Sequence, residues 1–280
     1  MLYVVATPIG NLADVTFRAL DVLRSVSVVA AEDTRITRRL FARYEITTRL
    51  TSFHANSGPM KLNELLARLR AGEDIAVVTD AGTPVVSDPG EDLVAAWAGE
   101  GGAVVAIPGA SAVLAAVVSS GIAGPRWGFD GFLPRSGRQR KERLARIAAD
   151  DRATVLFEAP TRLAGTLRDL AAVCGADRRA AVCRELTKLH EQVARGPLAE
   201  LAAAVGAAIP ARGEIVIVVS GAAAGTAVAD AEDPAATLAK ARARVAALVT
   251  GGTPRSEAAR QVAAETGLPR RELYGGSPGE

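Results

Sequence analysis

The sequence has few of the side chains that build metal and redox sites. Among 280 residues it contains two cysteines, Cys174 and Cys183, and two histidines, His54 and His190. The cysteines lack CxxC spacing and the histidines form no ligand cluster, so we expect no metal site. We interpret the cysteines as buried small residues in a reducing compartment, with a disulfide as the alternative.

Aromatic residues and long apolar runs are also scarce. Six Phe, three Tyr and two Trp give little support for an extended base-stacking platform of the kind that binds single strands. The longest apolar stretch, residues 103–118, is interrupted by Pro108, Gly109 and Ser111, which excludes a membrane span. No basic segment precedes the strand-like residues 2–6, so we expect no signal peptide and a cytoplasmic protein without a membrane partner.

Two common phosphate-binding loops are missing as well. The segment TPIGNLADVT (7–16) has one glycine where a dinucleotide fingerprint has three, and no lysine-bearing Walker loop occurs. Hydrophobic residues make up 49% of the chain and charged residues 23%, which predicts a well-buried globular core. The net charge of +2 neither favours nor excludes a nucleic-acid partner.

Short β-rich runs alternate with helical patterns through the first half of the chain. This alternation predicts an α/β fold with a mostly parallel sheet covered on both faces. The expected strands are 2–6, 26–30, 49–53, 75–79 and 103–107, and the expected helices are 15–24, 34–43, 60–71 and 90–99. A second α/β unit follows, with strands at 153–157, 180–184 and 214–220 and helices at 161–173 and 197–207.

The chain therefore divides into four predicted parts. These are an N-terminal α/β domain (1–121), a second α/β domain (122–222), a small-residue linker (223–233) and a helical tail (234–280). In the tail, the spacing of Ala258, Val262 and Leu273 around Gly267 predicts a helix-turn-helix. A plain helical hairpin that packs on the body is the alternative.

Four loops rich in glycine, proline and acids follow the predicted strands of the first domain. They are TPIGNLADVT (7–16), AAEDTRITRR (30–39), TDAGTPVVSDPG (79–90) and IPGASA (107–112). Because ligands bind at the carboxyl ends of strands in open α/β sheets, the loops predict one pocket, although each alone also suits a plain turn. Gly82 lets the backbone approach a ligand, and the Asp80 carboxylate suits a cationic one. Asp88 just precedes a helix and is expected to cap it or to form an Asx turn.

Two further charged segments stand at strand ends of the second domain, FEAPTR (157–162) and RELTKLHE (184–191). The second is either a site or a solvated helix face. The segment RSGRQRKERLAR (135–146) has six basic residues and one acid, and it either binds phosphates together with the arginines of residues 35–39 or is a solvated basic helix.

These motifs occur together in the order and spacing of one known family. They are TPIGNLADVTFRAL, AAEDTR, VTDAGTPVVSDPG, IPGASA, GFLPRSGRQR, FEAPTRL, RELTKLHE and RGEIV. Over residues 1–222 the chain resembles the tetrapyrrole-methylase-like (class III) S-adenosylmethionine-dependent methyltransferases. The resemblance implies two α/β domains with S-adenosylmethionine in the cleft between them, and a homodimer.

Within that family the chain is most similar to a branch that methylates a cytidine ribose 2′-hydroxyl of 16S rRNA, in the decoding region of the small ribosomal subunit. A small-molecule methylase of the tetrapyrrole type is one alternative. A non-catalytic RNA-binding protein, with the tail as its main contact, is another. The basic segment after GFLP and the helical tail favour RNA over a tetrapyrrole.

The resemblance also implies site residues. The donor-binding residues would be Pro8, Ile9, Gly10, Asp80, Ala81, Gly82, Thr83, Ser111, Ala112, Phe157, Leu186, Gly213, Glu214 and Ile215. We expect Glu185 or Glu158 to act as a base or to orient the acceptor, and Lys188 and Arg35 to assist electrostatically. The residues expected to hold phosphates are Arg135, Arg138, Arg140 and Lys141.

Overall fold

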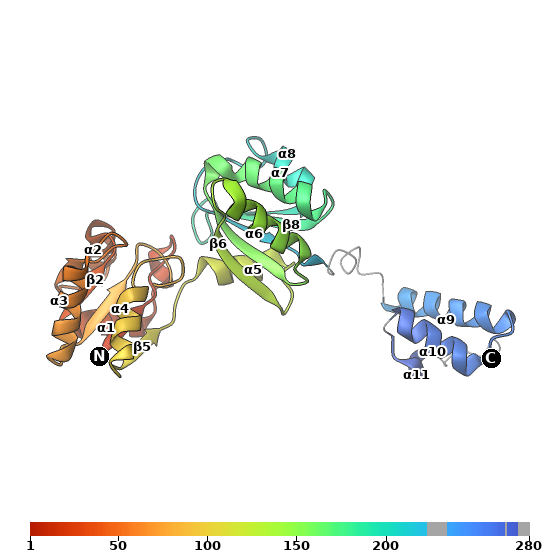
Figure 1. The fold of residues 1–280 in the computed structure, drawn as a ribbon, viewed down its shortest axis with the longest axis horizontal. Coiled ribbons are helices and arrows are strands. Elements are labelled where there is room, and N and C mark those ends of the chain that lie inside the picture. Colours follow the sequence, from red (N-terminus) through yellow and green to blue (C-terminus); the bar gives the residue numbers. More distant parts are fainter. Residues whose placement is uncertain (223–233, 267, 274–280) are drawn as a thin grey trace. The chain divides into compact units, whose positions relative to one another are not determined.

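The structure, a computed structural model, describes residues 1–222, 234–266 and 268–273. The chain forms two compact units, Met1–Ala224 and Gly225–Glu280, and the first contains two five-stranded sheets (Figure 1). The predicted linker (223–233) and Gly267 lie outside the described residues. None of the described helices is long and apolar enough to cross a membrane.

The first sheet is entirely parallel, as predicted, with the strand order β3-β2-β4-β1-β5. Its strands are β1 (Leu2–Val5), β2 (Val28–Ala31), β3 (Leu50–Ser52), β4 (Ile75–Val78) and β5 (Val104–Ile107). The helices between them are the 3-10 helix η1 (Leu12–Asp14), α1 (Phe17–Ser25), α2 (Thr34–Arg43), α3 (Pro59–Arg70) and α4 (Glu91–Gly99).

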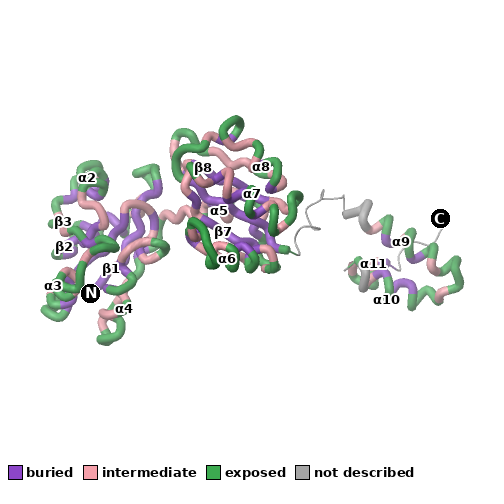
Figure 2. The backbone as a smooth tube through the Cα atoms, turned by 45° about the horizontal axis from the view of Figure 1, so that its top comes forward, coloured by how far each residue is buried: buried purple, intermediate pink, exposed green. Residues whose placement is uncertain are grey.

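Alternation along these strands places side chains on both faces of the sheet. Val29 and Val78 pack with α1 and α2, whereas Val28 and Val77 pack with α3 and α4. Because the strands are covered on both sides, they consist almost entirely of apolar residues. The central strands β2, β4 and β1 are almost entirely buried, whereas many residues of the surrounding helices are exposed (Figure 2).

The second sheet is mixed, with the order β6-β7-β10-β8-β9, and only its β6–β7 pair is parallel. Its strands are β6 (Trp127–Phe132), β7 (Ala153–Glu158), β8 (Arg179–Arg184), β9 (Gln192–Pro197) and β10 (Ile215–Val219). The helices are α6 (Gly137–Ala149), the 3-10 helix η2 (Pro160–Arg162), α7 (Leu163–Cys174) and α8 (Leu198–Ala204).

Helices α6, α7 and α8 cover one face of the second sheet. The other face packs against α5 (Ala112–Ser120), whose Val113 and Ala116 contact strand residues such as Val155 and Val218. The predicted first domain (1–121) therefore ends with a helix that packs on the second sheet. The boundary at 121 itself stays a prediction.

Strands β6 and β9 were not anticipated from the sequence, and they are the two edge strands of the second sheet. Strand β6 reads WGFDGF and β9 reads QVARGP, so both contain residues that are depleted in strands. An edge strand pairs on one side only, which tolerates such residues.

The second unit contains α9 (Pro234–Thr250), α10 (Arg255–Thr266) and α11 (Arg270–Leu273). Ala258, Val262 and Leu273 are buried together with Ala241 and Val245. The predicted small core of the tail is thus confirmed, and α9 supplies its third side.

Candidate functional site

A cavity of about 380 Å³ lies in the first unit, where loops after the first sheet meet the second sheet. Its wall is mostly apolar, and three acidic residues, Asp88, Glu158 and Glu214, are among the residues that line it. The lining residues are Ile9, Ala81, Gly82, Thr83, Val86, Ser87, Asp88, Ser111, Ala112, Val113, Phe132, Phe157, Glu158, Ala159, Pro160, Gly213, Glu214, Ile215 and Val216. A volume and lining of this kind are typical of small-ligand pockets.

The structure brings most of the predicted donor-binding residues together around this cavity. Those that line it are Ile9, Ala81, Gly82, Thr83, Ser111, Ala112, Phe157, Gly213, Glu214 and Ile215. Pro8, Gly10, Asp80 and Leu186 are not among the lining residues.

The TDAGTP part of the loop 79–90 is held against the first loop of the chain. Gly82 and Thr7 exchange two backbone hydrogen bonds, of 2.8 and 3.0 Å. The Thr7 hydroxyl also donates to the Thr79 carbonyl at 3.0 Å. Gly82 has a φ of 82°, in the left-handed region that favours glycine, so this bend needs a residue without a Cβ.

Two acids link the loops after β2 and β4. The Asp33 N–H donates to the Asp80 carboxylate at 3.0 Å, and the Asp80 N–H donates to the Glu32 carboxylate at 3.2 Å. Burial raises the pKa of Glu32 and that of Asp80 above their ordinary values. Neighbouring acids raise both further, so this corner of the site has a negative potential.

Asp88 is part of the cavity wall, and the prediction that it caps α4 is wrong. The N-cap of α4 is Gly90, and no side chain bonds to the end of this helix. Burial raises the pKa of Asp88 to about 6, with a further contribution from Glu32 and Asp80. Val85 and Ser87 hold left-handed φ angles of 76° and 65°, so the backbone before Asp88 is strained.

Lys188 lies in the loop after β8 and contacts the residue that precedes β10. Its ammonium group lies 2.9 Å from the Glu185 carboxylate and 3.1 Å from that of Glu214. Burial alone would lower the pKa of Lys188, but the two carboxylates outweigh it and raise that pKa. A Cβ on Gly10 would lie 2.4 Å from the Lys188 side chain, and one on Gly213 would lie 2.6 Å from Glu185. Both glycines therefore leave room for this ion pair.

Glu185 is engaged in the same contact. Its carboxylate accepts the Glu214 N–H at 2.9 Å, and this bond, followed by Lys188, holds the pKa of Glu185 below its ordinary value. Glu185 and Thr187 have φ angles of 51° and 67°, and the intervening Leu186 is buried with Ile9. The segment 185–191 is thus a strained loop and not a solvated helix face.

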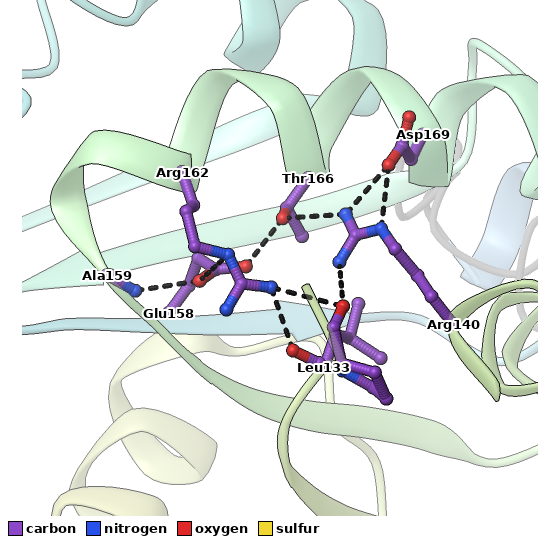
Figure 3. A network of polar contacts seen from close by, with 8 residues as sticks. Leu133, Arg140, Glu158, Ala159, Arg162, Thr166 and Asp169 are labelled. Atoms are coloured by element: carbon purple, nitrogen blue, oxygen red, sulfur yellow. Dashed lines mark hydrogen bonds and ion pairs between the residues drawn. The ribbon is translucent and has the colours of Figure 1, made fainter. Parts of the chain in front are cut away.

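Glu158 lies at the end of β7 in a network of polar contacts (Figure 3). Its side chain is 1% exposed and accepts hydrogen bonds from the Thr166 hydroxyl at 2.5 Å and the Ala159 N–H at 2.8 Å. Arg162 lies 3.3 Å from the same carboxylate. These contacts explain how an acid is accommodated in the interior beside the second sheet.

The predicted cations fall into two groups. Arg35 is 84% exposed and pairs with Asp33, whose pKa it holds at about 2. Arg138 is 91% exposed on α6, where it pairs with Glu142; Lys141 is exposed on the same helix, and Arg135 is exposed just before it. Arg140 instead is 11% exposed and binds Asp169 at 2.7 Å and the Pro134 carbonyl at 2.9 Å. Arg140 therefore turns inward, whereas Arg135, Arg138 and Lys141 are exposed.

Sequence reasoning assigned no role in the cavity to several of its lining residues, and Asp88 and Phe132 are the most informative. Asp88 stands in the loop 79–90, which the sequence predicts to line the pocket, but its position before a helix suggested a cap. Phe132 stands in GFLP, directly before the basic segment, and only the unanticipated strand β6 shows where its ring lies. Among the described residues, no three His, Cys, Asp or Glu side chains are placed to hold a metal ion.

Comparison with known proteins defines the class. Residues 1–202 match the family Tetrapyrrole (Corrin/Porphyrin) Methylases. The fold is shared with cobalt precorrin-4 methyltransferase CbiF, with a TM-score of 0.60 and 19% identity over 78% of this chain and 94% of that one. It is also shared with uroporphyrin-III C-methyl transferase from Thermus thermophilus complexed with S-adenyl homocysteine, with a TM-score of 0.56 and 17% identity over 79% and 98% of the two chains.

Curated relatives narrow the class further. The chain is 46% identical over 275 residues to Ribosomal RNA small subunit methyltransferase I of Synechocystis sp., covering 98% of this chain and 96% of that protein. It is 40% identical over 276 residues to the protein of the same name from Bacillus subtilis, covering 98% and 92%. The chain belongs to the tetrapyrrole methylase family, in the group formed by these ribosomal RNA small subunit methyltransferase I proteins, and it is a methyltransferase. The predicted family and fold class are thereby confirmed.

Proposed function

We propose that the chain methylates a cytidine ribose 2′-hydroxyl in 16S rRNA of the small ribosomal subunit, with S-adenosylmethionine as the methyl donor. The observation that carries the proposal is the cavity itself, which has an apolar wall and three acidic lining residues, in a unit that also has a helix rich in basic residues. Similarity to proteins named for ribosomal RNA methylation extends over 98% of the chain and supports the RNA substrate.

The residues of the cavity fit such a donor. S-Adenosylmethionine supplies a methyl group attached to a positively charged sulfonium, and it also carries an ammonium group. Asp80, Asp88 and Glu32 give the loops of the first sheet a negative potential that attracts such a cation. Ile9, Ile215 and the other apolar lining residues would bury its uncharged parts and exclude water.

We assign to Asp88 the role of the general base that accepts the proton of the acceptor hydroxyl. Glu185 is a weaker candidate because its ionised form is stabilised by Lys188 and the Glu214 N–H. Glu158 borders the cavity, but its carboxylate already accepts two hydrogen bonds and pairs with Arg162. Asp88 borders the cavity too, and its pKa of about 6 suits a general base near neutral pH.

The RNA would approach α6 and the residues just before it, where Arg138, Lys141 and Arg135 are exposed. Such side chains bind phosphate without reading sequence, and they steer the substrate toward the cavity. Arg140 contributes from inside, by holding the start of the helix. The predicted homodimer and the predicted cytoplasmic location stay predictions.

One transfer assay tests the proposal. The protein is incubated with donor labelled in its methyl group and with small ribosomal subunits, and a tetrapyrrole such as uroporphyrinogen III is offered in a parallel reaction. We expect label on the ribosomal RNA and none on the tetrapyrrole. Label on the tetrapyrrole would establish the small-molecule alternative, and RNA binding without any transfer to the ribosomal RNA would contradict the proposed substrate.

A further inference from the structure

Phe132 is a large apolar residue that the protein leaves open at its cavity. It ends β6 and lines the cavity, yet 53% of its surface is exposed. Its ring lies 5.6 Å from that of Phe157 at an angle of 59°, and Phe157 in turn lies 4.9 Å from Phe129. Phe157 and Phe129 pack against the core under α5, whereas more than half of Phe132 stays exposed.

The backbone that carries this ring is held by arginines. Arg162 donates to the Leu133 carbonyl at 2.8 Å and Arg140 to the Pro134 carbonyl at 2.9 Å. Arg143 donates to the Asp130 carbonyl at 2.7 Å and more distantly to that of Phe132. Carbonyls on both sides of Phe132 are therefore bound to charged donors.

The arginines are themselves oriented by fixed partners, as Figure 3 shows for two of them. Glu158 and Thr166 stand between Arg162 and Arg140, and Asp169 binds Arg140 from α7. A ring positioned in this way is ordered before its ligand arrives, which reduces the entropic cost of binding. Through Arg162 and Thr166, the buried Glu158 therefore helps to hold the backbone that carries the ring.

The position of the ring identifies the chemistry of that ligand. A flat π surface that is open on one side takes another flat surface, and exposed cations follow it at Arg135, Arg138 and Lys141. A nucleobase attached to phosphates matches both features. We propose that Phe132 is the stacking surface for the base of the nucleotide whose ribose is methylated.

This inference rests on the proposed RNA substrate and adds the residue that positions the acceptor. It requires one ring and not an extended aromatic platform, which agrees with a chain of only six Phe, three Tyr and two Trp. The adenine of the donor is the other nucleobase that could meet the ring. The acceptor base is favoured because the ring is exposed, beside the cations that would bind RNA.

The test compares Phe132→Leu with Phe132→Tyr. Leucine keeps apolar bulk but has no π face, whereas tyrosine keeps the ring. For small ribosomal subunits we expect kcat/KM to fall roughly 10- to 100-fold in Phe132→Leu and to be preserved in Phe132→Tyr. Binding of S-adenosylhomocysteine should be unchanged in both. Phe17→Leu removes an aromatic ring that is 88% exposed on α1, outside the cavity lining, and should behave as wild type.

Three results would overturn the inference. Unchanged kcat/KM in Phe132→Leu would show that the ring does not contact the acceptor. An equal loss of S-adenosylhomocysteine affinity would assign the ring to the donor. If the wild-type protein neither binds subunits nor transfers label, the proposed function fails as well. Failure of the role of Phe132 alone is therefore distinguishable from failure of the proposed function. Circular dichroism and urea unfolding of each variant separate these effects from misfolding.

Discussion

The loops that follow the strands of the first sheet and the helix α6 on the second sheet carry opposite charges. The loops after the first sheet bring together Glu32, Asp80 and Asp88, and burial raises the pKa of all three. In the second sheet, α6 connects β6 to β7; Arg138 and Lys141 are exposed on this helix, and Arg135 is exposed just before it. The difference separates two tasks, since an acidic pocket attracts a cationic donor and a basic surface attracts RNA.

The largest expected effect concerns Asp88 as the proton acceptor. Asp88→Asn keeps the shape of the side chain but removes its basicity, so methyl transfer should fall by roughly 10²–10³-fold. In the wild type, kcat/KM should rise with pH through about 6 because the Asp88 carboxylate must be ionised. The kcat profile should rise at a lower pH, since a bound cation lowers the pKa of Asp88. A variant with the wild-type rate would return the role to Glu185 or Glu158.

The second effect concerns the buried network of the second lobe. Glu158→Ala leaves Arg162 and the Thr166 hydroxyl without their acceptor, and we expect the free energy of unfolding to fall by about 3 kcal/mol. Urea titration measures the change. Arg152→Ala is the matched control in the same lobe, because it breaks an exposed pair with Asp150 and should leave unfolding almost unchanged. Similar losses in both variants would contradict the structural role of Glu158.

The third effect separates two arginines of α6. Arg138→Ala should raise the KM for small subunits about threefold, weaken its salt dependence and leave stability unaltered. Arg140→Ala should lower stability, because it removes bonds to Asp169 and Pro134. Initial rates at several salt concentrations, with thermal unfolding of each variant, measure the contrast. Identical behaviour would mean that Arg140 also serves the RNA surface.

The smallest effect is on stability and comes from the raised pKa of Asp88. The folded protein binds this proton more tightly than the unfolded chain does, because its pKa rises from 3.8 to about 6. The free energy of unfolding should therefore decrease as pH rises through that window. Asp88→Asn should remove this decrease. Above pH 6 its free energy of unfolding should exceed that of the wild type by about 1 kcal/mol, a figure reduced because Asp88 is partly exposed. Urea unfolding at pH 4.5 and 7.5 measures it.

The first sheet was predictable because its strands are short apolar runs between clear helical patterns. Strands β6 and β9 were missed because edge strands tolerate the glycine, aspartate and proline that argue against a strand. The loops that line the cavity were also found from sequence, since glycine, proline and acids follow successive strands. The orientation of a side chain depends on tertiary contacts that no motif records. For this reason Arg140 and Arg138 looked alike, Asp88 looked like a cap, and Phe132 was overlooked.

The central claim is that the cavity directs a methyl group to a ribose hydroxyl of small-subunit RNA. Its most direct test is to digest the labelled 16S rRNA with alkali, because a 2′-O-methyl group protects the adjacent phosphodiester bond. We predict that the label is recovered in one alkali-resistant dinucleotide that begins with cytidine, and that Asp88→Asn forms this product far more slowly. Label recovered in mononucleotides, on a base, would contradict the account.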